Sequence, residues 1–89
     1  MKRVHVFYSG NIQGIGFRYT TQDLAQKLGI KGWVKNLADG QVEIVAEGQK
    51  AILQVFLDKV GKQFQNYIKD VKLEWLKPTE EFKNFEIKF

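Results

Sequence analysis

The sequence contains no cysteine, and its 89 residues include one histidine, His5. Without cysteine the chain has neither a disulfide framework nor a thiolate nucleophile. A single imidazole argues against a zinc site, because such sites usually take three or four nitrogen or sulfur ligands. No apolar run approaches the roughly 18 residues that a membrane span requires, and no signal-peptide pattern opens the chain. These absences favour a cytoplasmic protein without membrane association, metal or cofactor.

The composition favours a packed globule. Hydrophobic residues make up 44% of the chain, and seven of them are phenylalanine. A chain of this length has room for one core, so residues 1–89 are expected to form a single domain, most simply a monomer. The net charge is +4, from 14 Lys plus Arg against 10 Asp plus Glu. That balance mildly favours anionic partners, although most basic residues are scattered as on a solvated surface.

Apolar periodicity predicts two helices and five strands. Period-two alternation predicts strands over residues 3–9, 30–36, 41–47 and 68–77, with a short one over 85–89. Helical spacing predicts helices over 17–28, before Gly29, and over 49–60, closed by Gly61, with a polar connection over 62–67. Asp39-Gly40 is a hairpin signal. On the first strand, His5 is expected on the more exposed face, without a catalytic role.

This element order predicts a ferredoxin-like α+β fold. The order is β-α-β-β-α-β plus a short last strand, which gives a mostly antiparallel sheet, two helices on one face and a C-terminal edge strand. The first two strands then run the same way, with the first helix returning between them. Their ends share one edge of the sheet, so Asn36 is expected to approach the loop that follows the first strand.

That loop, Gly10-Asn11-Ile12-Gln13-Gly14-Ile15-Gly16-Phe17-Arg18, is the strongest local signal. Its glycines can take left-handed backbone angles and let an object approach the amides closely. The helix start behind them offers unpaired N–H groups and the positive end of a dipole. Arg18 adds a planar fork of donors for two phosphate oxygens. The loop therefore predicts a phosphate-sized anion site, although glycine loops before helices also serve as plain turns.

Asn36 supplies a second candidate group. Its amide does not titrate, so it cannot act as a base, but it can orient a water for in-line attack on phosphorus. Phosphoryl transfer needs mainly positioning and charge stabilisation. An acyl phosphate suits such a site, because its carboxylate leaving group needs no general acid. The competing interpretation is that Asn36 is a turn former that bonds its own backbone.

These residues resemble the two signatures of the acylphosphatase family. The loop matches Gly-x-Val-Gln-Gly-Val-x-Phe-Arg, with isoleucine in both valine places. Gly32-Trp33-Val34-Lys35-Asn36, followed by Gly40-x-Val42 and Gly48, is similar to the second signature in residue type and spacing. Tyr8 stands where an aliphatic residue is usual. Leu37 stands where several members have a hydroxyl residue, a departure that bears on the catalytic rate more than on the type of reaction.

The resemblance implies hydrolysis of acyl phosphates to a carboxylate and inorganic phosphate without metal or cofactor. It implies that Arg18 binds the phosphate and that Asn36 orients the water. The phosphate-binding amides fall on Ile12, Gln13, Gly14, Ile15, Gly16 and Phe17.

Three other functions share individual features with this sequence. An RNA-binding module shares this layer order, and Lys31-Gly32-Trp33 is faintly similar to its motif, but the aromatic continuation is missing and the face would be charge-mixed. A domain of a larger carbamoyl-transfer maturation enzyme is disfavoured by the lack of zinc-finger cysteines. A non-catalytic anion sensor is disfavoured because both Arg18 and Asn36 are present.

Overall fold

The computed structural model describes all 89 residues and contains the seven expected elements. Their bounds are β1 Lys2–Gly10, α1 Phe17–Lys27, β2 Lys31–Asn36, β3 Val42–Gly48, α2 Lys50–Gln63, β4 Ile68–Leu76 and β5 Phe85–Lys88. Most bounds differ from the predicted ones by a residue or two. Neither helix has the length and apolar character needed to cross a bilayer.

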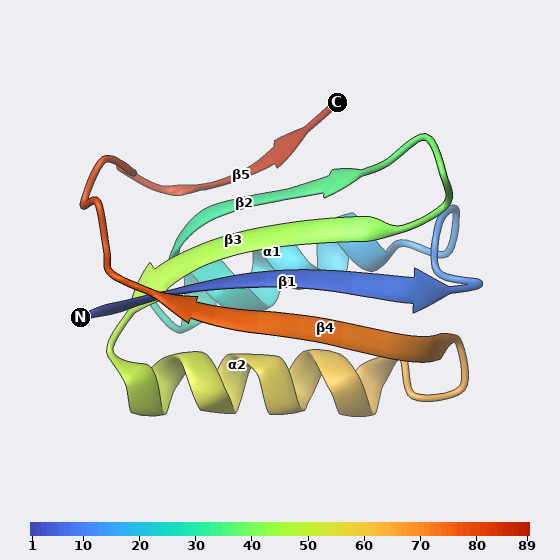
Figure 1. The fold of residues 1–89 in the computed structure, drawn as a ribbon, viewed down its shortest axis with the longest axis horizontal. Coiled ribbons are helices and arrows are strands. Elements are labelled where there is room, and N and C mark those ends of the chain that lie inside the picture. The colour runs from blue at the N-terminus through green and yellow to red at the C-terminus, as the bar shows by residue number, and fades with distance from the viewer.

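The five strands form one sheet in the order β4-β1-β3-β2-β5 (Figure 1). β3 is antiparallel to both of its neighbours, and β4 is antiparallel to β1. β5 runs parallel to β2 at the edge of the sheet. The predicted ferredoxin-like fold, with its mostly antiparallel sheet and C-terminal edge strand, is therefore confirmed. β1 and β2 point the same way on either side of β3, so their C-terminal ends meet at one edge.

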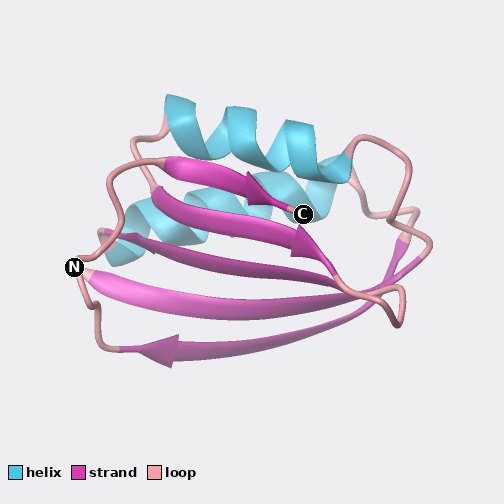
Figure 2. Cartoon of the chain, turned by 90° about the horizontal axis from the view of Figure 1, so that it is seen from above, coloured by secondary structure: helices cyan, strands magenta, loops and turns pink.

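Both helices cover the same face of the sheet (Figure 2). Alternate residues of the central strands point into the layer between sheet and helices, as the period-two pattern predicts. Val4, Val6 and Tyr8 of β1 are buried there, and so is every second residue of β3 from Val42 to Ala46. Four phenylalanines, Phe17, Phe56, Phe64 and Phe85, belong to the same core. His5 lies on the opposite face, half-buried, with its Nε2 2.6 Å from Glu43 Oε2.

The predicted end of α2 at Gly61 is wrong. The helix continues through Gly61 to Gln63, and Phe64 follows as its C-cap. A glycine ends a helix when it adopts a left-handed conformation, as Gly29 does at φ +70°. Gly61 is not among the glycines with positive φ. The extra turn brings Phe64 into the core, where its ring lies 4.7 Å from that of Phe17.

A buried carboxylate fixes the segment that leads into β5. Glu47 of β3 is only 2% exposed. Its carboxylate accepts hydrogen bonds from the backbone N–H groups of Thr79, at 2.7 Å, and Glu80, at 3.0 Å. Arg3 lies 3.5 Å from the same carboxylate and 3.3 Å from Glu81. The chain between β4 and β5 is therefore tied to the centre of the sheet although it has no regular structure.

Gly32 is a point where the sheet requires glycine. It has φ +144°, and a Cβ there would lie 1.9 Å from the carbonyl oxygen of Val45. We expect Gly32→Ala to lower the free energy of unfolding by at least about 2 kcal/mol, because backbone strain and a clash with the neighbouring strand add. Gly61→Ala is the control, since nothing lies within 4 Å of a Cβ at that helical position. It should raise stability by about 0.5–1 kcal/mol. Chemical denaturation measures both, and equal stabilities would contradict the prediction.

Candidate active site

The loop between β1 and α1 begins with a glycine pressed against the chain after α2. Gly10 has φ +137°, and a Cβ there would lie 2.2 Å from the carbonyl oxygen of Tyr67. The same oxygen accepts a hydrogen bond from the Asn11 backbone N–H at 2.9 Å. The register between β1 and β4 also shifts at Ser9 and Gly10. This close approach turns the chain out of the sheet and directs the loop over the end of the strands.

Apolar side chains anchor the two ends of the loop in the core. Ile12 is fully buried, and Phe17 is 2% exposed. The Phe17 ring packs between those of Tyr8, at 5.3 Å, and Phe64, at 4.7 Å. Tyr8 thus replaces the usual aliphatic residue as a packing surface. Its burial raises the pKa of the phenol well above the ordinary value, so Tyr8 stays neutral at physiological pH.

The middle of the loop leaves its backbone open. Gly14 and Gly16 both have φ +82°, and no atom lies within 4 Å of where a Cβ would stand. Gly16 is also the N-cap of α1, which begins without a side-chain cap or an acidic residue in its first turn. The first N–H groups of a helix have no partner within the helix. These groups and the positive end of the helix dipole are therefore available to an anion.

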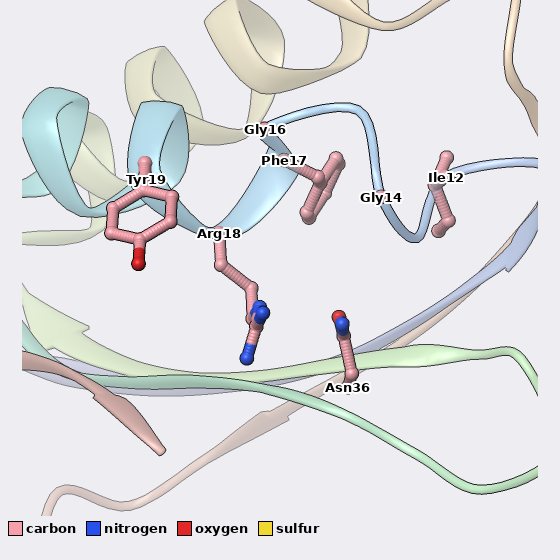
Figure 3. Close-up of a pocket in the computed structure, with 7 residues that line it drawn as sticks. All are labelled: Ile12, Gly14, Gly16, Phe17, Arg18, Tyr19 and Asn36. Carbon is pink, nitrogen blue, oxygen red and sulfur yellow. The ribbon is translucent and has the colours of Figure 1, made fainter. Parts of the chain in front are cut away.

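The loop, the start of α1 and the end of β2 together line one pocket of about 180 Å³ (Figure 3). The lining residues are Ile12, Gly14, Gly16, Phe17, Arg18, Tyr19 and Asn36. The structure thus brings Arg18 and Asn36 to one pocket, as the shared sheet edge predicted. Of the predicted loop residues, Gln13 and Ile15 do not line it, whereas Tyr19, which sequence reasoning missed, does. Tyr19 is exposed in the first turn of α1, where an aromatic residue gives no separate signal.

The Gln13 side chain links the loop to the connection that follows Asn36, a contact that the sequence did not predict. Its Nε2 donates hydrogen bonds to the carbonyl oxygens of Leu37, at 2.8 Å, and Gln41, at 3.0 Å. Both acceptors belong to the connection between β2 and β3, directly after Asn36. Gln13 therefore ties the loop to the end of the strand that carries Asn36.

Arg18 has no carboxylate within ion-pair distance; all five ion pairs in the structure involve other residues. Its guanidinium carbon lies 4.9 Å from the centre of the Phe89 ring. The side chain extends from α1 towards the sheet, into the space that Asn36 also faces (Figure 3). No intramolecular anion therefore competes for the guanidinium donors.

Asn36 points from β2 towards the glycine loop (Figure 3). Its Oδ1 is buried and makes no hydrogen bond within the protein. The competing interpretation was that Asn36 hydrogen-bonds the backbone of its own turn. Its Oδ1 makes no such bond. That role falls to Asp39, whose Oδ1 accepts the Gln41 backbone N–H at 3.0 Å. The backbone and then the side-chain hydrogen bond from Gln41 hold the Asp39 pKa below its ordinary value. A buried acceptor without a partner is costly, so Oδ1 is available to accept a hydrogen bond from a water or a polar ligand in the pocket.

The charged side chains offer no ready metal centre. No three His, Cys, Asp or Glu side chains come together in a group able to hold an ion. The pocket itself is lined by an arginine, an asparagine, a tyrosine, backbone and apolar groups. This set provides hydrogen-bond donors and one positive charge, which suits a phosphate better than a cation.

Fold and pocket together define a ferredoxin-like α+β protein with a small basic pocket at one edge of its sheet. Comparison with known proteins identifies this class more closely. The family model described as Acylphosphatase matches residues 4–87. Because the match spans nearly the whole chain, the chain belongs to the acylphosphatase family, whose members are hydrolases that act on acyl phosphates.

Individual relatives agree with this assignment. The acylphosphatase of Trichormus variabilis is 44% identical over 88 residues, which cover 97% of this chain and 85% of the relative. That of Lactobacillus johnsonii is 42% identical over 89 residues, which cover 98% of each chain. The crystal structure of acylphosphatase from Bacillus subtilis superposes with a TM-score of 0.90 at 35% identity, and each chain is covered completely. These matches support an enzyme rather than the RNA-binding module or the non-catalytic anion sensor.

Proposed function

We propose that this protein hydrolyses the carboxyl–phosphate bond of small acyl phosphates, with Arg18 and Asn36 as its catalytic residues. The phosphoryl group sits in the loop, where backbone N–H groups between Ile12 and Phe17 and the Arg18 guanidinium bind its oxygens. The pocket is smaller than the ~300–1,000 Å³ clefts that enclose drug-sized ligands. It therefore holds the phosphoryl group and leaves the acyl part outside, which permits broad acyl specificity.

The reaction is an in-line displacement at phosphorus. Asn36 Oδ1 accepts a hydrogen bond from a water and directs its oxygen at phosphorus opposite the leaving carboxylate. The new P–O bond forms as the bond to the acyl oxygen breaks, and the carboxylate departs with that electron pair. A non-bridging phosphoryl oxygen takes the water's proton, so the products are a carboxylate and inorganic phosphate. Arg18 and the loop amides stabilise the charge on the equatorial oxygens.

The observation that carries this proposal is the pairing of two unsatisfied groups in one pocket. Arg18 has a free donor fork, and Asn36 has a buried acceptor without a partner. A bound phosphate supplies acceptors to the first, and a water on the far side of phosphorus supplies a donor to the second. The turn after Asn36 does not need the Asn36 side chain, because Asp39 and Gln13 already stabilise it.

The proposal predicts hydrolysis of benzoyl phosphate that is unaffected by a chelator. It also predicts that inorganic phosphate is a competitive inhibitor, which raises the apparent KM and leaves kcat unchanged, because the product occupies the loop. Steady-state rates with EDTA present and absent, across a series of phosphate concentrations, measure both effects. A rate that falls with EDTA and recovers with a divalent cation would exclude this mechanism. Non-competitive inhibition would place the phosphate elsewhere.

We expect the protein to work as a monomer in the cytoplasm, without nucleic acid, membrane or a second protein. One chain supplies every lining residue of the pocket, so the proposed chemistry needs no partner.

A further inference from the structure

We propose that Tyr19 forms the wall of an acyl subsite, which gives the enzyme a preference for aromatic over small aliphatic acyl phosphates. This inference deepens the proposed function and rests on it, because it needs a phosphoryl group held by the loop and Arg18. Tyr19 is the one residue of the pocket lining to which the proposed mechanism gives no part. It lies in the first turn of α1, next to the phosphate-binding arginine.

The Tyr19 ring has no partner within the protein. It is 64% exposed. Its hydroxyl makes no hydrogen bond, and its ring takes part in no aromatic pair or cation–π contact. Trp33 and Trp75, by contrast, each have a lysine amine over the ring, that of Lys88 at 4.6 Å and that of Lys50 at 5.2 Å. The Tyr19 ring therefore stays in contact with water until an apolar group from outside covers it.

The direction of the proposed reaction brings the acyl group to this ring. Tyr19 and Asn36 lie on opposite sides of the Arg18 guanidinium (Figure 3). An in-line displacement places the attacking water and the leaving oxygen on opposite sides of phosphorus. In the proposed mechanism Asn36 holds the water, and Arg18 binds the oxygens between the two. The acyl group therefore leaves the pocket on the side where Tyr19 lies.

The chemistry of this side favours an uncharged aromatic acyl group. The pocket of about 180 Å³ is filled by the phosphoryl group, so an acyl group contacts Tyr19 at its mouth. A tyrosine ring packs best against a flat apolar group, which an acetyl group is too small to be. Arg18 is the only charged side chain in the lining, so an acyl group with a second carboxylate finds no second cation. The preference is graded, because the acyl group is not enclosed.

The first test compares benzoyl phosphate with acetyl phosphate in steady-state kinetics. The ratio of their kcat/KM values isolates the acyl group, because both substrates carry the same phosphoryl group. Tyr19→Ala should lower this ratio about 2- to 10-fold, the effect of losing one aromatic pair. Alanine is the best helix former, so the variant should fold like the parent. Tyr19→Phe should keep the parental ratio, because the ring makes the contact.

Tyr67→Ala is the matched control for the loss of an exposed tyrosine. Tyr67 is 45% exposed and lies outside the pocket lining. Its hydrogen bonds to Asn11 and Phe64 are made by the backbone, so the substitution leaves them in place. The ratio for benzoyl and acetyl phosphate should not change in this variant.

The second test measures binding without turnover. In phenacylphosphonate and acetonylphosphonate a methylene replaces the bridging oxygen of benzoyl and acetyl phosphate, so neither can be hydrolysed. Titration calorimetry should show tighter binding of phenacylphosphonate to the parent, and Tyr19→Ala should reduce the difference by the same factor as in the kinetics. Phenacylphosphonate should also shift the NMR signals of the Tyr19 ring more than acetonylphosphonate does, because its own ring lies against them.

Two results would overturn the acyl subsite. One is an unchanged ratio of benzoyl to acetyl phosphate in Tyr19→Ala. The other is a loss of affinity for inorganic phosphate as large as the loss for phenacylphosphonate, which would place Tyr19 on the phosphoryl group instead. The phosphonates also separate this inference from the proposed function. If the parent hydrolyses neither substrate but binds phenacylphosphonate through Tyr19, the function fails and the subsite stands.

Discussion

Arg18→Ala is expected to abolish measurable phosphate binding and to lower kcat/KM for benzoyl phosphate at least about 1,000-fold. The guanidinium is the only charged side chain that lines the pocket. In the proposed mechanism, its bidentate hydrogen bonds bind the phosphoryl oxygens in the ground state and strengthen as charge develops on them in the transition state. The loop amides remain in the variant, but they carry only partial charges. Titration calorimetry and steady-state kinetics measure the two losses independently.

Arg3→Ala is the matched control for this substitution. Arg3 is the other arginine of the chain, so its replacement by alanine changes the net charge by the same amount. The Arg3 side chain stacks on Phe82, away from the pocket. Its loss weakens contacts to Glu47 and Glu81, so assays belong well below the unfolding temperature. Arg18→Lys keeps the charge without the planar fork and should recover only part of the affinity. An Arg18→Ala variant that still binds phosphate like the parent would remove Arg18 from the site.

Asn36→Ala is expected to lower kcat about 100- to 1,000-fold while the affinity for inorganic phosphate stays close to that of the parent. The proposed role of Asn36 is exerted on the attacking water, which is not needed for phosphate to occupy the loop. Loss of an interaction made only in the transition state lowers kcat and leaves ground-state binding unchanged. The two substitutions should therefore have distinct effects. Asn36→Ala should lower the rate alone, and Arg18→Ala should lower both the rate and the affinity for phosphate.

Asn84→Ala controls for the loss of an asparagine amide next to the sheet. Asn84 lies beside the start of β2, at the far end of that strand from Asn36. Its backbone carbonyl oxygen accepts the Gly32 N–H, a bond that the substitution leaves in place. It should keep the parental rate. If Asn36→Ala keeps most of its activity, the water-orienting role is wrong. If it loses phosphate affinity in proportion to its rate, Asn36 binds the phosphoryl group instead.

The sequence alone determined the parts of this protein that depend on local patterns. Alternation such as that of Val4, Val6 and Tyr8 predicts strands, because successive side chains of a strand point to opposite faces. The order of these elements then leaves few topologies, and the ferredoxin-like one was confirmed. The glycine loop before α1 and Arg18 in its first turn were also readable, because both signals lie within nine consecutive residues.

The tertiary structure alone decided how residues far apart in the chain meet. From the sequence, Asn36 could equally well be a turn former. The structure places it in the pocket with no hydrogen bond to its Oδ1, and the side chain that bonds the turn is that of Asp39. The Gln13 side chain and the stacking of Phe89 on Arg18 were not foreseen at all. Each of these contacts joins two segments that approach only when the sheet forms. Local propensity carries no information about such contacts, because their free energy depends on distances that the assembled fold creates.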